Sequence, residues 1–117
     1  MPARDGGRDI VACDILVDDV HWYNIEVKHW RARNVGSTQA SACLETAIRE
    51  GRKGALLIST GGVGPAAMSV RSEAHRDYLR FGEEQKVVLT CKHYVANAAG
   101  LWRPIRDFRT FLLDQTV

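Results

Sequence analysis

The stretch WYNIEVKHWRARNVGSTQASACLETAIREGRKGALLIS (22–59) decides the fold. It begins with WYNIEVKHW (22–30), which has the composition of a β-strand. A helix over 37–50 is expected next, because a serine or threonine can cap its start and Gly51 can adopt the left-handed conformation that ends it. The run ALLIS (55–59) is typical of a buried strand. The helical side chains expected to face the sheet are Ala40, Leu44, Ala47 and Ile48.

The residues before this stretch predict one further strand. The run DIVACDILV (9–17) is apolar and β-branched, with two embedded acidic residues. Asp18 and Asp19 favour a turn, because aspartate can hydrogen-bond its own backbone in tight geometry. We therefore expect 9–17 and 22–30 to form an antiparallel hairpin.

The residues after this stretch predict further elements. The run TGGVGP (60–65) is expected to be a flexible loop. It is not a phosphate-binding loop, since it lacks the Lys-Ser/Thr of that motif. A helix over 70–81 would end at Gly82. A strand is expected over 86–95. The remaining expectations are a turn at 97–100 and a closing helix over 105–113, with Pro104 in its first turn and with Ile105, Phe108, Phe111 and Leu112 buried.

This order of elements predicts the α/β class, with a central mixed β-sheet flanked by helices. The 117 residues are expected to form a single domain (1–117), because two separate cores would each be too small. Residues 1–8 are polar and contain Pro2, Gly6 and Gly7, so we expect them to be a flexible end.

Composition excludes several classes of protein. Apolar residues make up 45% and charged residues 26% of the sequence, close to the globular average, which excludes disorder and fibrous repeats. No apolar run approaches the ~20 residues that span a bilayer, and no secretory leader is recognisable, so no membrane association is expected. Cys13, Cys43 and Cys91 lack the paired spacing of a zinc site, which predicts reduced thiols in a cytoplasmic compartment.

The net charge of +2 conceals a separation along the chain. Residues 1–27 hold two arginines and six acidic residues, a net charge of −4. Residues 28–117 hold fourteen basic and eight acidic residues, a net charge of +6. The basic residues of 28–117 are available to bind phosphate groups. The excess of acidic residues in 1–27 requires an explanation, such as a site that uses carboxylates.

Two carboxylates and an ammonium are expected to meet at one edge of the sheet. Side chains alternate along a strand, so Glu26 and Lys28 lie on the same side, together with Trp22 and Asn24. In the expected hairpin, Asp14 lies near Glu26 across the two strands. Neighbouring carboxylates repel each other, and Mg²⁺ relieves that repulsion while it polarises a phosphoryl oxygen. A lysine beside them can orient the attacking water.

This segment resembles the PD-(D/E)xK nuclease superfamily, whose signature is an Asp followed at variable distance by (Asp/Glu)-x-Lys on the next strand. Asp14 and Glu26-Val27-Lys28 match that signature. In small Holliday-junction-resolvase-like members, the second motif strand leads into a helix that often bears a glutamine, and then into an apolar strand. Gln39 and the run at 55–59 match those features, and the resemblance covers about half the chain.

The resemblance implies a restriction-endonuclease-like core and a role for each matching residue. Asp14 and Glu26 would bind Mg²⁺ or Mn²⁺, with the carbonyl of Val27 as a further ligand. Lys28 would position the nucleophilic water, and Gln39 would support the site or contact a backbone phosphate. These residues are therefore the candidate catalytic and metal-binding set.

The first motif acid has an alternative. Asp9 begins RDIVA, which also reads like the start of a motif strand, and Asp9 and Asp14 lie on opposite faces of a regular strand. Only one of them can join Glu26, and the shorter interval favours Asp14. Family members usually carry an acidic residue on a helix before the first motif strand. No Glu precedes Glu26 here, so Asp5 or Asp9 would have to substitute.

Basic residues on either side of the helix suggest a surface for nucleic acid. Trp30 is flanked in the sequence by Lys28, Arg31 and Arg33. Cations mixed with an aromatic ring are typical of nucleic-acid-binding surfaces, but they also occur at ordinary solvent-exposed strand ends. Arg52 and Lys53 lie at the end of the helix, where the helix dipole favours cations whether or not DNA is present.

The sequence is therefore interpreted as a cytoplasmic Mg²⁺-dependent endonuclease, of a bacterium or a phage-infected cell, that hydrolyses phosphodiester bonds in Holliday-junction or otherwise branched DNA. Cutting two strands symmetrically would require a homodimer. The alternatives are a catalytically weak nucleic-acid-binding module on the same fold, and a phage-type accessory protein that acts through protein contacts.

Overall fold

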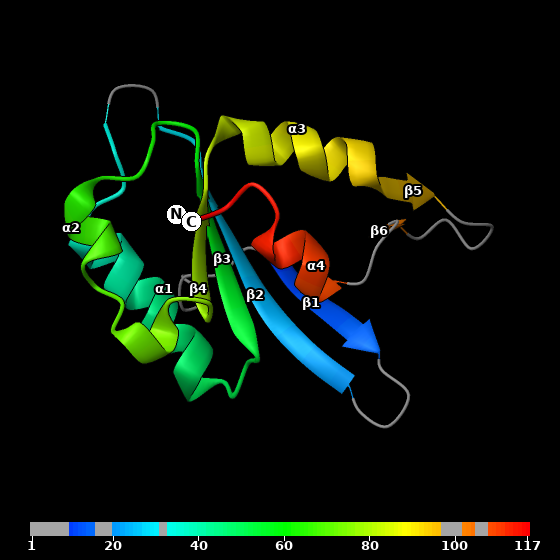
Figure 1. Ribbon diagram of the computed structural model, residues 1–117, viewed down its shortest axis with the longest axis horizontal. Coiled ribbons are helices and arrows are strands. Elements are labelled where there is room, and N and C mark those ends of the chain that lie inside the picture. Colours follow the sequence, from blue (N-terminus) through cyan, green and yellow to red (C-terminus); the bar gives the residue numbers. More distant parts are fainter. Residues whose placement is uncertain (1–9, 16–19, 31–32, 97–101, 105–107) are drawn as a thin grey trace, which may run out of the picture.

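The structure is a computed structural model that describes residues 10–15, 20–30, 33–96, 102–104 and 108–117 (Figure 1). A four-stranded sheet has the order β1-β2-β3-β4, with bounds Ile10–Ile15, Val20–Lys28, Gly54–Ser59 and Leu79–Gly82. Strands β5 and β6, Tyr94–Ala96 and Trp102–Pro104, pair separately. The helices are α1, α2, α3 and α4, with bounds Ser37–Arg49, Pro65–Met68, Glu84–His93 and Phe108–Leu113, and a 3₁₀ turn η1 spans Glu73–His75. The predicted α/β class with a mixed sheet is confirmed.

The sheet combines both strand directions. Strands β1 and β2 are antiparallel, as expected for the hairpin, whereas β2, β3 and β4 are parallel. Helix α1 connects β2 to β3, and α2 with η1 connects β3 to β4. The carboxyl ends of the three parallel strands therefore meet at one edge of the sheet, at the top of Figure 1.

Helices cover both faces of the sheet. All six residues of β3 are buried, and its side chains alternate between two cores. Ala55 and Leu57 pack with α1 and α2, whereas Leu56 and Ile58 pack with Phe111 and Leu112 of α4. The predicted burial of Phe111 and Leu112 is confirmed. Because β3 has no solvent-facing side, it fixes the positions of the layers on either side of it.

The bounds of α1 agree with the predicted helix over 37–50 to within one residue. Ala40, Leu44 and Ala47 are buried as expected, but Ile48 is 49% exposed, so its predicted contact with the sheet is wrong. The side chain that completes the buried stripe is Cys43. Successive helical residues are about 100° apart, and this rotation carries Ile48 off the stripe that ends at Ala47.

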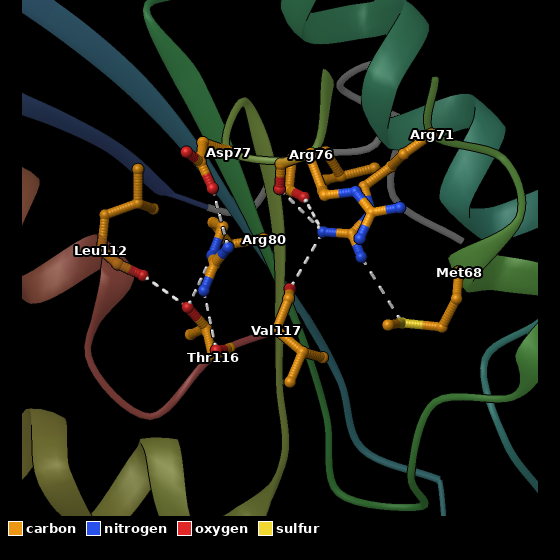
Figure 2. A network of polar contacts seen from close by, with 9 residues as sticks. Met68, Arg71, Arg76, Asp77, Arg80, Leu112, Thr116 and Val117 are labelled. Carbon is orange, nitrogen blue, oxygen red and sulfur yellow. Dashed lines mark hydrogen bonds and ion pairs between the residues drawn. The ribbon is translucent and has the colours of Figure 1, made fainter. Parts of the chain in front are cut away.

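The expected helix over 70–81 is wrong, because Leu79–Gly82 forms strand β4 instead. Leu79 and Phe81 are buried beside β3, so pairing with the sheet overrides their helical spacing. Residues 116–117 then line the outer edge of β4 (Figure 2). Phe81 and Val117 exchange two backbone hydrogen bonds, and Arg71 donates to the carbonyls of both Leu79 and Val117.

The expected strand over 86–95 is also wrong, because Glu84–His93 forms helix α3 and only Tyr94–Ala96 is extended. Val87 and Val88 are more than one-third exposed, so they do not build a strand core, whereas Lys86 is fully buried. Pro104 lies at the end of β6 rather than in the first turn of a helix. The predicted turn at 97–100 and Ile105 lie outside the described residues, as does the predicted flexible end at 1–8.

Lys86 joins α3 to the end of α4. Its ammonium donates to the carbonyls of Phe111 and Asp114 and lies 3.8 Å from the centre of the Phe111 ring. The Lys86 stem passes Gly82 so closely that a Cβ on Gly82 would approach it to 2.8 Å. Burial lowers the pKa of Lys86 to about 8, although Asp114 opposes that shift.

No described helix is long and apolar enough to cross a lipid bilayer.

Replacing Lys86 by Met should remove a pH dependence of stability. The folded-state pKa of about 8 lies below the ordinary value of 10.5, so the unfolded chain binds more protons between these pH values. The wild-type free energy of unfolding should therefore rise from pH 8 to 10.5 through Lys86, by roughly 2 kcal/mol, and this rise should be absent from Lys86→Met. Urea denaturation across that range measures both curves, and parallel curves would contradict the assignment.

Candidate active site

Glu26 and Lys28 form an ion pair near the carboxyl end of β2. Lys28 Nζ lies 2.7 Å from Glu26 Oε2, and the two side chains share one face of the strand, as predicted. Glu26 is only 5% exposed, whereas the Lys28 side chain keeps 28% of its surface in solvent. The pair therefore extends from the buried layer beneath α1 to the surface at the sheet edge.

The Glu26 carboxylate lies in a buried polar row between the sheet and α1. Asn24, on the same face of β2, donates from Nδ2 to Glu50 Oε1 at 2.9 Å and ties the strand to the residue that follows α1. Cys43 on α1 is 1% exposed and belongs to the buried cluster beneath this helix. Burial, followed by the charge of Glu26, raises the pKa of Cys43 to about 12, so this thiol is protonated at neutral pH.

The expected register of the first two strands is wrong. Asp14 pairs with His21, five positions before Glu26, which corresponds to roughly 16 Å along β2. Ile10 pairs with Ile25, the immediate neighbour of Glu26. Tyr23 and Ile25 on one face of β2 pack into the apolar core that α4 covers, and a turn sequence alone does not reveal the register that accompanies this packing. Asp9, the alternative first acid, lies outside the described residues.

Gln39 has a structural role at the start of α1. Its Oε1 accepts a hydrogen bond from the backbone N–H of Gly36 at 3.1 Å, which satisfies a donor at the helix N-terminus. Its predicted support of a metal or phosphate stays a prediction. Val27 lies between Glu26 and Lys28 in sequence, and strand alternation directs its side chain to the opposite face. The role predicted for its carbonyl also stays a prediction.

Two cationic side chains lie near the Trp30 ring, and one of them is Lys28 of the ion pair. The Arg33 guanidinium lies 3.9 Å from the centre of the indole ring, and Lys28 Nζ lies 6.0 Å from it. Trp30 is half-buried against the core beneath α1, while Arg33 is exposed. Stacking on a fixed ring preorganises the Arg33 guanidinium at the same sheet edge as Lys28. Arg31 lies outside the described residues.

The loop over 60–65 is packed rather than flexible, which corrects the sequence-based expectation. Val35 donates to the Gly62 carbonyl at 3.0 Å, and Gly64 donates to the Val35 carbonyl at 3.0 Å. A Cβ on Gly61 would lie 2.2 Å from the Arg33 carbonyl oxygen and 2.8 Å from that of Trp30. The glycine thus permits the backbone contact that holds the described part of the segment bearing Trp30 and Arg33.

The other predicted basic residues lie at the far end of the sheet. Lys53 donates its backbone N–H to the Trp22 carbonyl at 2.8 Å, and Trp22 is six positions before Lys28 on β2. This spacing corresponds to roughly 20 Å. Arg52 pairs with Glu50 at 3.5 Å. The basic residues that the structure describes therefore form two separate regions, and Arg33 lies at the same end of β2 as the Glu26–Lys28 pair.

Among the described side chains, no three His, Cys, Asp or Glu residues gather as metal ligands. Glu26 is an oxygen ligand of the type that Mg²⁺ prefers, and the Lys28 ammonium lies 2.7 Å from its Oε2. A second carboxylate is required to complete such a site, and the register leaves Asp14 too distant to supply it within one chain.

Comparison with known proteins gives one relative and no family. The chain is 33% identical over 103 residues to the uncharacterized protein y4cE of Sinorhizobium fredii (strain NBRC 101917 / NGR234). The matched residues are 87% of this chain and 26% of that protein, so the chain spans about a quarter of its relative's length. No protein-family model and no solved structure matches the chain.

Adding a Cβ at Gly61 should disturb the Trp30–Arg33 segment. The carbonyls of both residues obstruct the new atom, so Gly61→Ala should lower the free energy of unfolding by about 1–3 kcal/mol. Gly36→Ala is the matched control, because its nearest contact is 3.7 Å away and its cost should stay below about 1 kcal/mol. Chemical denaturation compares the two, and equal losses would contradict the close packing at Gly61.

Proposed function

We propose that this chain is a metal-dependent endonuclease domain of the PD-(D/E)xK type, with a restriction-endonuclease-like core, that hydrolyses phosphodiester bonds in DNA. The observation that carries the proposal is the Glu26–Lys28 ion pair at the carboxyl end of a parallel strand. A carboxylate and an ammonium on alternate residues of that strand supply a cation ligand and a group that orients water.

Each described residue has a distinct role in the proposed chemistry. Glu26 ligates Mg²⁺ or Mn²⁺, and the bound cation supplies charge stabilisation at the phosphoryl oxygen. Lys28 is the more exposed partner, so its ammonium can contact solvent and hold a water for attack on phosphorus. Lys28 also stabilises the negative charge that develops on the non-bridging oxygens. Arg33, preorganised by Trp30, contacts an adjacent phosphate.

Asp9, which lies outside the described residues, is the remaining candidate for the second carboxylate, because the strand register removes Asp14. Ile10 is opposite Ile25, and Asp9 and Glu26 are the sequence neighbours of these two residues. Asp14 is opposite His21, away from the ion pair. We therefore assign the first acid of the motif to Asp9, the alternative that the sequence left open.

The proposed substrate is DNA, with branched DNA as the preferred form and a homodimer as the working assembly. The two basic regions support contact with more than one phosphate. Lys28 and Arg33 lie at one end of β2, and Arg52 and Lys53 lie roughly 20 Å away at the other end. Phosphates separated by that distance are available on a duplex or at a junction.

Removing either partner of the ion pair should abolish cleavage. Glu26→Gln deletes the anionic ligand and Lys28→Met deletes the ammonium, and each should lower cleavage of a four-way junction and of linear duplex at least about 100-fold in Mg²⁺ or Mn²⁺. Glu45→Gln, on the exposed face of α1, is the matched control and should cleave like the wild type.

The same assay separates the alternative functions. Binding without cleavage by the wild-type chain would support a nucleic-acid-binding module instead of an enzyme. Absence of DNA binding even at low salt would exclude both nucleic-acid functions, because phosphate contacts are strongest there.

The two candidate first acids can be distinguished by a pair of equivalent substitutions. Asp9→Asn should reduce cleavage at least about 100-fold, whereas Asp14→Asn should change it less than about threefold, because Asp14 is opposite His21 in the hairpin. Initial cleavage rates at saturating Mg²⁺ give this comparison. The reverse ranking would reject the assignment of Asp9 while leaving the roles of Glu26 and Lys28 intact.

A further inference from the structure

Ser59 is a buried polar residue at the carboxyl end of β3. It is 0% exposed, and its Oγ has no hydrogen-bond partner among the described residues. Strand alternation places Ser59 on the same face of β3 as Ala55 and Leu57, which pack beneath α1. A buried hydroxyl is costly without a partner, and such groups are usually satisfied by a protein group or by an ordered water. The Ser59 hydroxyl therefore indicates a small polar ligand in this layer.

The strand register places this hydroxyl next to the ion pair. Ser59 is the partner of Lys28 in the parallel pairing of β2 with β3. Neighbouring strands lie about 4.8 Å apart, and paired residues direct their side chains to the same face. The Thr60 N–H donates to the Lys28 carbonyl at 3.0 Å, and the Gly62 N–H donates to the Ser59 carbonyl at 3.3 Å. These backbone contacts fix Ser59 beside the Lys28 side chain.

A water molecule fits the chemistry of the groups that meet here. Lys28 Nζ carries three N–H donors, and Glu26 Oε2, at 2.7 Å, can accept one of them. A water that accepts a second Lys28 donor can exchange a hydrogen bond with the Ser59 hydroxyl, which both donates and accepts. A buried water requires two to four such polar partners. A cation suits this place less well, because it would lie beside the Lys28 ammonium.

We propose that Ser59 is a water-positioning residue, whose hydroxyl and the Lys28 ammonium together hold one water beside Glu26. Its role in catalysis rests on the proposed nuclease function, in which Lys28 directs this water at phosphorus, whereas the binding of the water does not. Lys28 is a long side chain that is partly in solvent, but Ser59 is short and buried. The serine therefore restricts the position of the water more closely than the lysine alone.

A double-mutant cycle on stability tests the bound water without any assay of activity. Ser59→Ala should lower the urea midpoint of unfolding by roughly 0.5 M, because the water loses a partner. In the Lys28→Met background the same substitution should have less than half of this effect, since the other holder of the water is already absent. Ser69→Ala is the control, because it removes an exposed hydroxyl that donates to the Pro65 carbonyl, and its effect should be equal in both backgrounds.

Two outcomes of this cycle would overturn the proposal. If Ser59→Ala leaves the midpoint unchanged or raises it, the hydroxyl holds no water and its removal only relieves the cost of burying it. If Ser59→Ala lowers the midpoint equally with and without the Lys28 ammonium, the hydroxyl is not linked to the ion pair.

Kinetics and cation binding test the role of the water in cleavage. Ser59→Ala should lower kcat for DNA cleavage about tenfold, while KM for DNA and Kd for Mn²⁺ each change less than about twofold. Ser69→Ala should leave kcat unchanged. An unchanged kcat in Ser59→Ala would reject the role in cleavage, and a loss of Mn²⁺ binding would mean that Ser59 ligates the cation instead. A wild-type chain that cleaves nothing would reject the proposed function and leave the stability cycle to decide whether the water is bound.

Discussion

Burial of β3 on both faces is the constraint on which the rest of the structure depends. Its six residues have no access to solvent, so one layer of helices must cover each face. Helix α1 supplies one cover as the crossover from β2 to β3, and α4 supplies part of the other through Phe111 and Leu112. The crossover also makes β2 and β3 parallel, which brings their carboxyl ends to one edge. The Glu26–Lys28 pair lies next to that edge because of this arrangement.

The same constraint places a charged carboxylate of the site in a buried layer. Covering β3 with α1 also covers the adjoining face of β2, and that face carries Asn24 and Glu26. A carboxylate in such a layer is costly unless it is paired, and here Lys28 pairs with Glu26. Apolar residues of similar size would often be no less stable at such a position. The buried charge beside a partly exposed lysine and a stacked arginine is the arrangement on which the proposed chemistry rests.

Local sequence predicted the elements whose own pattern agrees with their packing. The bounds of α1 and β3 follow from an amphipathic stretch and an apolar run, although the N-cap of α1 is Gly36 and not the expected serine or threonine, and the alternation in β2 placed Glu26 and Lys28 on one face. The register of β1 could not be read in the same way, because it depends on how the two strands pair and not on the pattern of either strand alone. In the second half, the burial of Lys86 and the pairing of Leu79 with β3 are tertiary interactions that reverse the local preference. The packed loop at Gly61 and the inward-facing Cys43 were missed for a similar reason, although the spacing of Cys43 between Ala40 and Ala47 was a signal for its burial.

We propose that Glu26 and Lys28 form a cation-dependent active site rather than a structural ion pair. Titration of the isotopically labelled chain with Mn²⁺, followed through backbone amide signals, tests it most directly because paramagnetic broadening marks the residues nearest the ion. We expect broadening at low Mn²⁺ to be centred on Glu26 to Lys28 and to disappear in Glu26→Gln, while signals of α4 at the opposite core persist. Broadening that is centred elsewhere, or that is unchanged in Glu26→Gln, would contradict it.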